Sequence, residues 1–193
     1  MKYPVILADP PWHYQNYSTT PGQVHMRARG AARHYPTMTV DQLSALEVPV
    51  ADDAVLLMWA VWPLMVDAFK VITAWGFEYK TLAWVWVKLN RNSMGLFYGM
   101  GNYTRSNSEP CLLAVRGNAP KATAHDIQSV IMTPIQEHSR KPDEQYAKIE
   151  SLFPNLPYLE MFARRARPGW DVWGNQAPNS IELPLFSGEA ANG

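Results

Sequence analysis

Four consecutive residues near the start of the chain, Asp9-Pro10-Pro11-Trp12, combine groups that suit a flat base bearing an amino group. The Asp9 carboxylate is an anionic acceptor, and proline leaves its neighbourhood rich in free carbonyl oxygens because it has no N–H to donate. The carboxylate and the Pro10 carbonyl can together accept both hydrogens of an exocyclic amine while the Trp12 indole stacks on the ring. Two such acceptors orient the nitrogen lone pair toward an electrophile and offset the positive charge that develops on it, so the segment predicts chemistry on an amine.

An Asp-Pro pair taken alone is more typical of a turn that ends a strand. Its position favours a functional role, because the apolar run 3–8 predicts a buried strand that the two prolines end. Ligands of open α/β sheets bind beyond the carboxyl ends of strands, which is where Asp9 would lie.

Strands and helices alternate along the rest of the chain, and they must position this strand end. Pro63 and Pro142 predict helix starts, and Thr39 with Gln42 has the spacing of a capping box. Since strand-helix-strand units build parallel sheets, we expect an α/β fold with helices on both faces of the sheet. The predicted strands are 3–8, 54–59, 81–87, 111–115, 158–162 and 169–173, the predicted helices 39–46, 63–75 and 142–152, and the long irregular segments 13–37 and 90–107.

The composition is that of one globular domain, with 47% hydrophobic and 18% charged residues in 193. Cys111 is the only cysteine, so no internal disulfide forms, and its apolar surroundings predict an inert thiol. The five histidines show no metal-ligand spacing, so no metal is expected. No apolar run reaches the roughly 18 residues of a membrane span and no signal-peptide core is present, so we expect a cytoplasmic protein without membrane contact.

Positive charge is segregated although the net charge is zero. Residues 10–40 and 79–108 contain no Asp or Glu. A basic face of this kind permits phosphate binding, but a solvated face without function fits the spacing equally well. The candidate substrate contacts in these two segments are Arg27, Arg29, Arg33, Lys88 and Arg105.

Seven blocks of sequence, in their order and spacing, resemble the MT-A group of S-adenosylmethionine-dependent adenine amino-methyltransferases, which includes the catalytic subunit of the eukaryotic messenger RNA adenosine methylase and many bacterial and phage enzymes. The resemblance covers residues 5–176. It implies a Rossmann-like methyltransferase sheet, permuted so that the catalytic strand precedes the cofactor-binding strand. The blocks are ADPPW at 8–12, HYPTM at 34–38, LLMW at 56–59, AWGFEYKTLAWVWVK at 74–88, TRSNSEPCLLAVRG at 104–117, EHSRKPDEQY at 137–146 and LEMFARRARPGWDVWGNQ at 159–176.

The resemblance also implies roles for individual residues. Residues 9–12 match the catalytic tetrapeptide, with Asp9 between amine and cofactor. Lys141 matches the lysine near the methionine carboxylate of S-adenosylmethionine, and Glu160 matches the acid that holds the ribose hydroxyls. Further cofactor contacts are implied for Arg164, Asn175 and Gln176, and a substrate-facing gate for His34 and Tyr35. Taken alone, each of these residues more often occupies an ordinary surface position, and Trp59, Trp75, Trp84 and Trp86 are expected to be packing residues.

We therefore expect a methyltransferase domain at 1–176 and a polar C-terminal tail at 177–193. The expected function is methylation of the exocyclic amino group of adenine by S-adenosylmethionine, in DNA because the compact form resembles bacterial and phage members. Two alternatives remain open: methylation of adenine in RNA by the same residues, and a catalytically silent nucleic-acid-binding subunit, which would be expected to lack Asp9 or Lys141. Because no separate target-recognition domain is evident, specificity is expected from 13–37 and 90–107 or from a partner, and a homo-oligomer or a partner subunit is left open.

Overall fold

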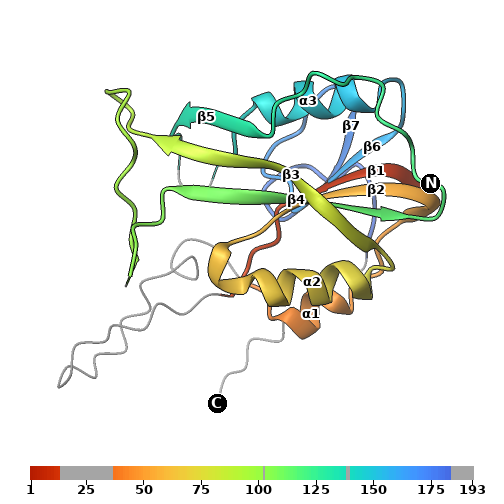
Figure 1. Ribbon diagram of the computed structural model, residues 1–193. Coiled ribbons are helices and arrows are strands. Elements are labelled where there is room, and N and C mark those ends of the chain that lie inside the picture. Colours follow the sequence, from red (N-terminus) through yellow and green to blue (C-terminus); the bar gives the residue numbers. More distant parts are fainter. Residues whose placement is uncertain (14–36, 102, 138–139, 184–193) are drawn as a thin grey trace, which may run out of the picture.

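The computed structural model describes residues 1–13, 37–101, 103–137 and 140–183 (Figure 1). Within these residues the chain forms a seven-stranded sheet with the strand order β5-β3-β4-β2-β1-β6-β7. The strands are β1 (Tyr3–Ala8), β2 (Val50–Trp59), β3 (Glu78–Leu89), β4 (Ser108–Arg116), β5 (Val130–Pro134), β6 (Tyr158–Met161) and β7 (Trp170–Trp173).

One strand runs against the other six. β1 pairs in parallel with β2 and β6, β6 with β7, and β3 with β5, whereas β4 is antiparallel to both β2 and β3. The predicted strand at 111–115 is confirmed as β4, whose direction the sequence pattern left open. Parallel pairing requires a crossover, and because the segment between β3 and β4 contains no described helix, β4 returns alongside β3.

The sequence pattern also missed β5, which lies in the irregular stretch before Pro142. This strand is at the edge of the sheet, and of its five residues Ile131 alone is buried. An edge strand with one buried side chain carries almost none of the alternation that identifies a strand from sequence.

The helices begin where the sequence predicts. They are α1 (Val40–Ser44), the 3-10 turn η2 (Trp62–Leu64) that leads into α2 (Met65–Ala74), and α3 (Glu144–Leu152). At α1 both capping-box bonds form: the Thr39 hydroxyl accepts from the Gln42 N–H, and the Gln42 side chain accepts from the Thr39 N–H. Pro63 lies in the first positions of η2, where its missing N–H leaves no helix bond unmade.

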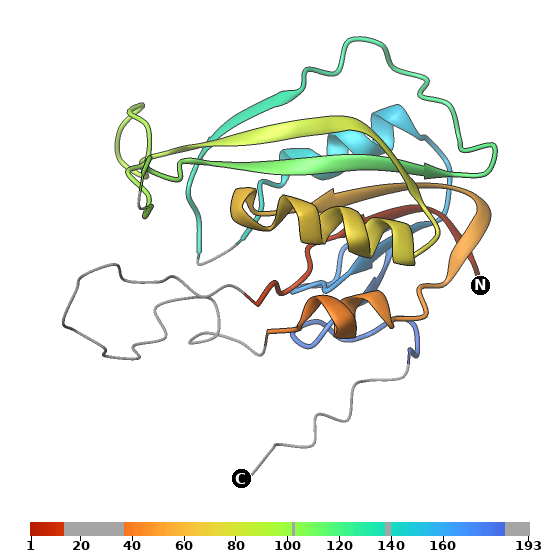
Figure 2. The ribbon, with the colours of Figure 1, turned by 60° about the horizontal axis from the view of Figure 1, so that its bottom comes forward.

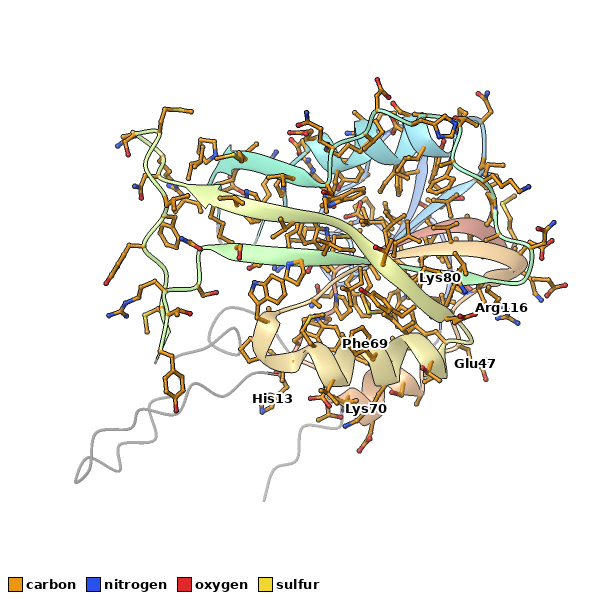
Figure 3. The ribbon with its side chains drawn as sticks, viewed as in Figure 1. His13, Glu47, Phe69, Lys70, Lys80 and Arg116 are labelled. Atoms are coloured by element: carbon orange, nitrogen blue, oxygen red, sulfur yellow. The ribbon has the colours of Figure 1, made fainter. Side chains whose placement is uncertain are left out.

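Two hydrophobic cores lie on opposite faces of the sheet. Figures 1 and 2 show α1 and α2 on one face and α3 on the other, which confirms the predicted helices on both sides. Alternation along β2 divides its side chains between the cores: Leu56 and Met58 pack toward α1 and α2, and Leu57 and Trp59 toward α3. At the edge of the first core, the ring of Phe69 on α2 lies 4.9 Å from that of Tyr79 on β3 (Figure 3).

The helix arrangement creates a switch point beside β1. The connection from β1 to β2 carries α1 on one face, whereas the connection that leads into β6 carries α3 on the other. β2 and β6 flank β1 in the sheet and run parallel to it, so the carboxyl ends of all three meet at one edge. A crevice at such an edge is where doubly wound sheets bind ligands.

Packing continues past residue 176. The Ser180 N–H donates to the Val172 carbonyl, and Ile181 and Leu183 pack against the α1 and α2 core. The division at residue 176 stays a prediction. Among the described residues, no helix has the length and apolar character needed to cross a membrane.

Candidate active site

A cavity of about 230 Å³ lies at the switch point, between the carboxyl ends of β1, β2 and β6 and the start of α3. Its walls are strongly charged. The acids are Asp9, Glu137 and Glu160, and the cations are Arg140, Lys141, Arg164 and Arg165. Leu7, Trp59, Gln145, Tyr146, Phe162 and Gln176 complete the lining.

Asp9 follows the last residue of β1 and forms a close ion pair. Lys141 Nζ donates to both of its carboxylate oxygens, at 2.7 and 2.8 Å. Burial raises the pKa of Asp9 above its ordinary value, and the adjacent Lys141 ammonium opposes that rise. The structure thus joins two predicted site residues that lie 132 positions apart in the sequence.

The rest of the tetrapeptide is fixed by backbone bonds and burial. The Pro10 carbonyl accepts from the Trp12 N–H at 2.8 Å, and the Pro11 carbonyl accepts from the Met38 N–H at 2.8 Å. Trp12 is 6% exposed, and its indole N–H donates to the Trp59 carbonyl at 3.1 Å. Pro10, Pro11 and Trp12 do not line the cavity, so Asp9 is the one residue of the tetrapeptide in its lining. The stacking role of Trp12 stays a prediction.

Glu160 lies on β6, next to the β1 strand end. The Tyr146 hydroxyl of α3 donates to its two carboxylate oxygens at 3.1 and 3.0 Å. Burial raises the pKa of Glu160 to about 7, assisted by the charge of Asp9 and opposed by the Tyr146 bond and by Arg165 and Arg167. Glu160 is therefore a carboxyl group that titrates near neutral pH inside the cavity wall.

Glu109 is a charged residue of this edge that the sequence analysis did not select. It is the second residue of β4, and its carboxylate contacts Lys88 at 2.5 Å and Lys141 at 3.5 Å. Burial would raise its pKa, but Lys141 and Lys88 outweigh burial and hold the pKa below the usual value. The available signal was an acid that opens an otherwise apolar strand, but only the antiparallel direction of β4 brings it to this edge.

Trp59 combines packing with a place in the cavity wall. Its indole N–H donates to the buried Gln145 side chain at 2.7 Å, and Lys141 Nζ lies 5.5 Å from its ring centroid. The expectation that these tryptophans are packing residues is correct for Trp75, Trp84 and Trp86, whose side chains belong to the two cores, but it is incomplete for Trp59. Nothing in the sequence distinguishes Trp59 from them except its place at the end of a strand.

The remaining predicted residues lie at different distances from the cavity. Arg164 and Gln176 line it, whereas Asn175 is exposed and is not part of the lining. Arg105 lies in the segment between β3 and β4, with its guanidinium 4.8 Å from the Tyr98 ring centroid. Arg27, Arg29, Arg33, His34 and Tyr35 are outside the described residues.

Cys111 and the other potential metal ligands among the described residues do not form a cluster. Cys111 is buried, and burial raises the pKa of its thiol. In the described part of the chain, no group of three or more His, Cys, Asp or Glu side chains is arranged to hold a metal ion.

A charged cavity at the switch point of a largely parallel sheet, with acids after β1 and on β6, is typical of an α/β enzyme domain. The comparisons with known sequences make this specific: a sequence model of the MT-A70 family matches residues 3–176, and the chain belongs to that family. The predicted family and enzyme class, an adenine amino-methyltransferase, are thereby confirmed, as is the predicted α/β methyltransferase fold.

Relatives of this chain occur in bacteria and eukaryotes. The Type II methyltransferase M.MunI of a Mycoplasma species is 36% identical over 197 residues, which cover 95% of this chain and 82% of that protein. The human N(6)-adenosine-methyltransferase catalytic subunit METTL3 is 32% identical over 180 residues, or 91% of this chain and 28% of METTL3. An MT-A70-like N(6)-adenosine-methyltransferase of Arabidopsis thaliana is also 32% identical, over 93% of this chain and 24% of its own length. The chain thus spans about a quarter of these eukaryotic relatives and most of the bacterial one.

Proposed function

We propose that this chain transfers a methyl group from S-adenosylmethionine to the exocyclic amino group of adenine in DNA. The observation that carries the proposal is the Asp9 carboxylate at the end of β1, ion-paired with Lys141 in the wall of the switch-point cavity. Asp9 belongs to the tetrapeptide whose residue types alone predict chemistry on an amine, and it lies where an α/β sheet binds its ligand.

The cavity residues fit S-adenosylmethionine, which supplies the electrophilic methyl group when bound. The Glu160 carboxylate at the end of β6 is a paired acceptor suited to the two ribose hydroxyls. Lys141 and Arg164 are cations suited to the methionine carboxylate, and Gln176 adds an amide to the wall. Trp59 and Phe162 would provide apolar surface for the adenine of the cofactor and for the carbons next to its sulfonium sulfur.

Asp9 can hold the amine without releasing Lys141. An ionised carboxylate has about four acceptor positions, and Lys141 uses one on each oxygen, so a position remains for an amine N–H. The Pro10 carbonyl likewise has a second lone pair beyond the one used by the Trp12 N–H. Held in this way, the amine would keep its lone pair free to attack a methyl carbon, and Asp9 would offset the positive charge that grows on nitrogen until one N–H proton is released.

The preference for DNA rests on the length and identity of the match. This chain covers 82% of M.MunI, a Type II methyltransferase, but only 28% of human METTL3. Methylation of adenine in RNA is the alternative, since the catalytic residues do not distinguish the two polymers. Initial rates on matched DNA and RNA oligonucleotides, each single- and double-stranded, test this directly, and a higher kcat/KM on RNA contradicts the choice of DNA.

The segment between β3 and β4 supports contact with a polymer. It follows the carboxyl end of β3 (Figures 1 and 2), which lies on the same side of the sheet as the carboxyl end of β1 because these strands run in the same direction. Tyr98 and Tyr103 are 74% and 103% exposed, and Arg105 lies over the Tyr98 ring. Exposed aromatic rings together with arginine suit the stacking of unpaired bases. Lys80 and Arg116 lie at the other end of the sheet (Figure 3), so the positive charge of β3 and β4 does not form one continuous face.

The decisive experiment replaces Asp9 by asparagine, which keeps the shape and removes the charge. We expect kcat to fall at least about 100-fold, by analogy with the loss of one group that stabilises transition-state charge, while S-adenosylmethionine binding by calorimetry stays within a few-fold. Asp67→Asn is the matched control, because Asp67 is also ion-paired, with Lys70 at 2.9 Å, but lies on α2. Unchanged turnover in Asp9→Asn would refute the proposal.

The same assay addresses the silent-subunit alternative. If the unmodified protein binds S-adenosylmethionine saturably yet methylates none of the four oligonucleotides, the chain is a nucleic-acid-binding subunit and not a catalyst. Assays with and without candidate partner subunits separate this outcome from a requirement for assembly.

A further inference from the structure

Four charged side chains of alternating sign form a row along the catalytic edge: Lys88, Glu109, Lys141 and Asp9. Lys88 Nζ lies 2.5 Å from one Glu109 oxygen, the other Glu109 oxygen lies 3.5 Å from Lys141 Nζ, and Lys141 donates to both Asp9 oxygens. The row starts on β3, passes the start of β4 and the segment before α3, and ends after β1. All four side chains are only 11–24% exposed, so each ion depends on its neighbours to offset its lost hydration.

Glu109 and Asp9 compete for the same ammonium group. Glu109 has a second cation, Lys88, and the contact with Lys88 is 1 Å closer than the contact with Lys141 (2.5 against 3.5 Å). As long as Lys88 neutralises Glu109, Lys141 can remain on Asp9. Without Lys88, Glu109 would be a buried carboxylate that depends on Lys141 for its ion pair, and its attraction would draw Lys141 away from Asp9.

We propose that Lys88 is a positioning residue for the amine-binding carboxylate: by neutralising Glu109, it leaves Lys141 to Asp9. This inference rests on the proposed function of Asp9, and it replaces the expectation that Lys88 contacts nucleic acid. The surroundings of Lys88 agree, because its ammonium is 5.0 Å from the Trp86 ring centroid and is already engaged by Glu109. A cation in this position is poorly placed to reach a phosphate.

The inference predicts a change in pH dependence. The charged and titratable groups that interact electrostatically with Asp9 are Lys141, Glu109, Cys111, Arg164 and Glu160. Of these, Lys141 opposes the burial of Asp9 most strongly. If Lys141 moves toward Glu109, the pKa of Asp9 rises, and the acidic limb of the rate profile moves to higher pH.

The test measures kcat against pH, at saturating S-adenosylmethionine and DNA, in a series of variants at Lys88 and Glu109. Lys88→Met is expected to move the acidic limb up by about one pH unit, and Lys88→Arg to leave it in place. In Lys88→Met combined with Glu109→Gln the limb is expected to return, because the competing carboxylate is then absent. The matched control is Lys80→Met on the same strand, where Lys80 pairs with Glu78 in an exposed position (Figure 3).

A phosphate contact would give a different result. In that case Lys88→Met would raise KM for DNA and lower the salt dependence of binding by about one charge, without moving the limb, and Glu109→Gln would not restore activity. An unmoved limb in Lys88→Met, or no restoration by Glu109→Gln, overturns the inference but leaves Asp9 as the amine acceptor. An active Asp9→Asn instead rejects the proposed function itself. If Lys88→Met does not fold, circular dichroism reveals it and the double variant decides: a wild-type limb with an unchanged KM for DNA supports the inference, and a displaced limb or a raised KM for DNA opposes it.

Discussion

Glu160 offers a direct test of the energetics of the cavity. Its carboxyl group has a pKa of about 7 in the folded protein, against an ordinary value of 4.5, chiefly because it is buried. Between these two values the folded state binds more protons than the unfolded state, so the free energy of unfolding falls as pH rises from about 4.5 through about 7. The stability that the protonated Glu160 carboxyl gives to the fold is fully present below the unfolded pKa of 4.5 and is lost as pH rises above the folded pKa of about 7.

The magnitude follows from the difference between the folded and unfolded pKa values. Because a tenfold change in a proton-binding constant corresponds to about 1.4 kcal/mol, the ionised Glu160 destabilises the fold by roughly 3 kcal/mol above pH 7. Glu160→Gln removes the charge but keeps an oxygen that can accept the Tyr146 hydroxyl bond. The free energy of unfolding of the variant minus that of the wild type is expected to be roughly 2 to 3 kcal/mol larger at pH 8 than at pH 5.

The assay is urea denaturation of both proteins at pH 5 and pH 8, followed by fluorescence. All other titrating groups are shared, so the pH dependence of the difference belongs to Glu160 and the groups coupled to it. Glu78→Gln removes an exposed carboxylate and serves as the control. If the free energy of unfolding changes with pH by the same amount in wild type and Glu160→Gln, the reasoning is refuted. The same substitution is expected to weaken S-adenosylmethionine binding, which would show that a destabilising carboxylate is retained for ligand binding.

Two further predictions concern backbone conformation and buried packing. Gly117→Ala is expected to destabilise the fold by about 2 kcal/mol in urea denaturation, because φ is +59° and the new Cβ would lie 2.3 Å from Asp53 Oδ1. Gly169→Ala is expected to lose only about 1 kcal/mol, because φ is +79° but nothing lies within 4 Å of the new Cβ. Equal losses would contradict the steric argument. Trp12→Phe is expected to lower stability by about 2 kcal/mol, since it removes a buried indole and its bond to the Trp59 carbonyl, and an unchanged urea midpoint would show that Trp12 is not a packing residue.

The elements nearest the site follow closely from local sequence signals. The apolar run before two prolines is β1, and Asp9 comes directly after it as expected. The Thr39 and Gln42 spacing forms its capping box, and Pro142 precedes α3. These signals are reliable because each depends on interactions within a few residues, such as a missing N–H or a side chain that reaches the next helical turn.

The direction of β4 depends on interactions that no local pattern contains. Its apolar residues 111–115 fit a parallel or an antiparallel strand equally well, since both faces are buried. Antiparallel pairing brings the start of the strand, with Glu109, to the edge where β1 and β2 end, whereas a parallel strand would place Glu109 at the opposite edge. The competition between Glu109 and Asp9 for Lys141 is therefore a property of the topology.

By itself the sequence determined the order of most elements, the chemistry of the Asp9 segment and membership of the family, because residue types, spacing and local backbone restrictions are written along the chain. Only the tertiary structure decided which distant side chains interact in the site: Lys141 with Asp9, Tyr146 with Glu160 and Lys88 with Glu109. The physical reason is that the pKa and the partner of a buried charge depend on what surrounds it in three dimensions, and those surroundings come from strand order and direction, which residues far apart in the chain set together.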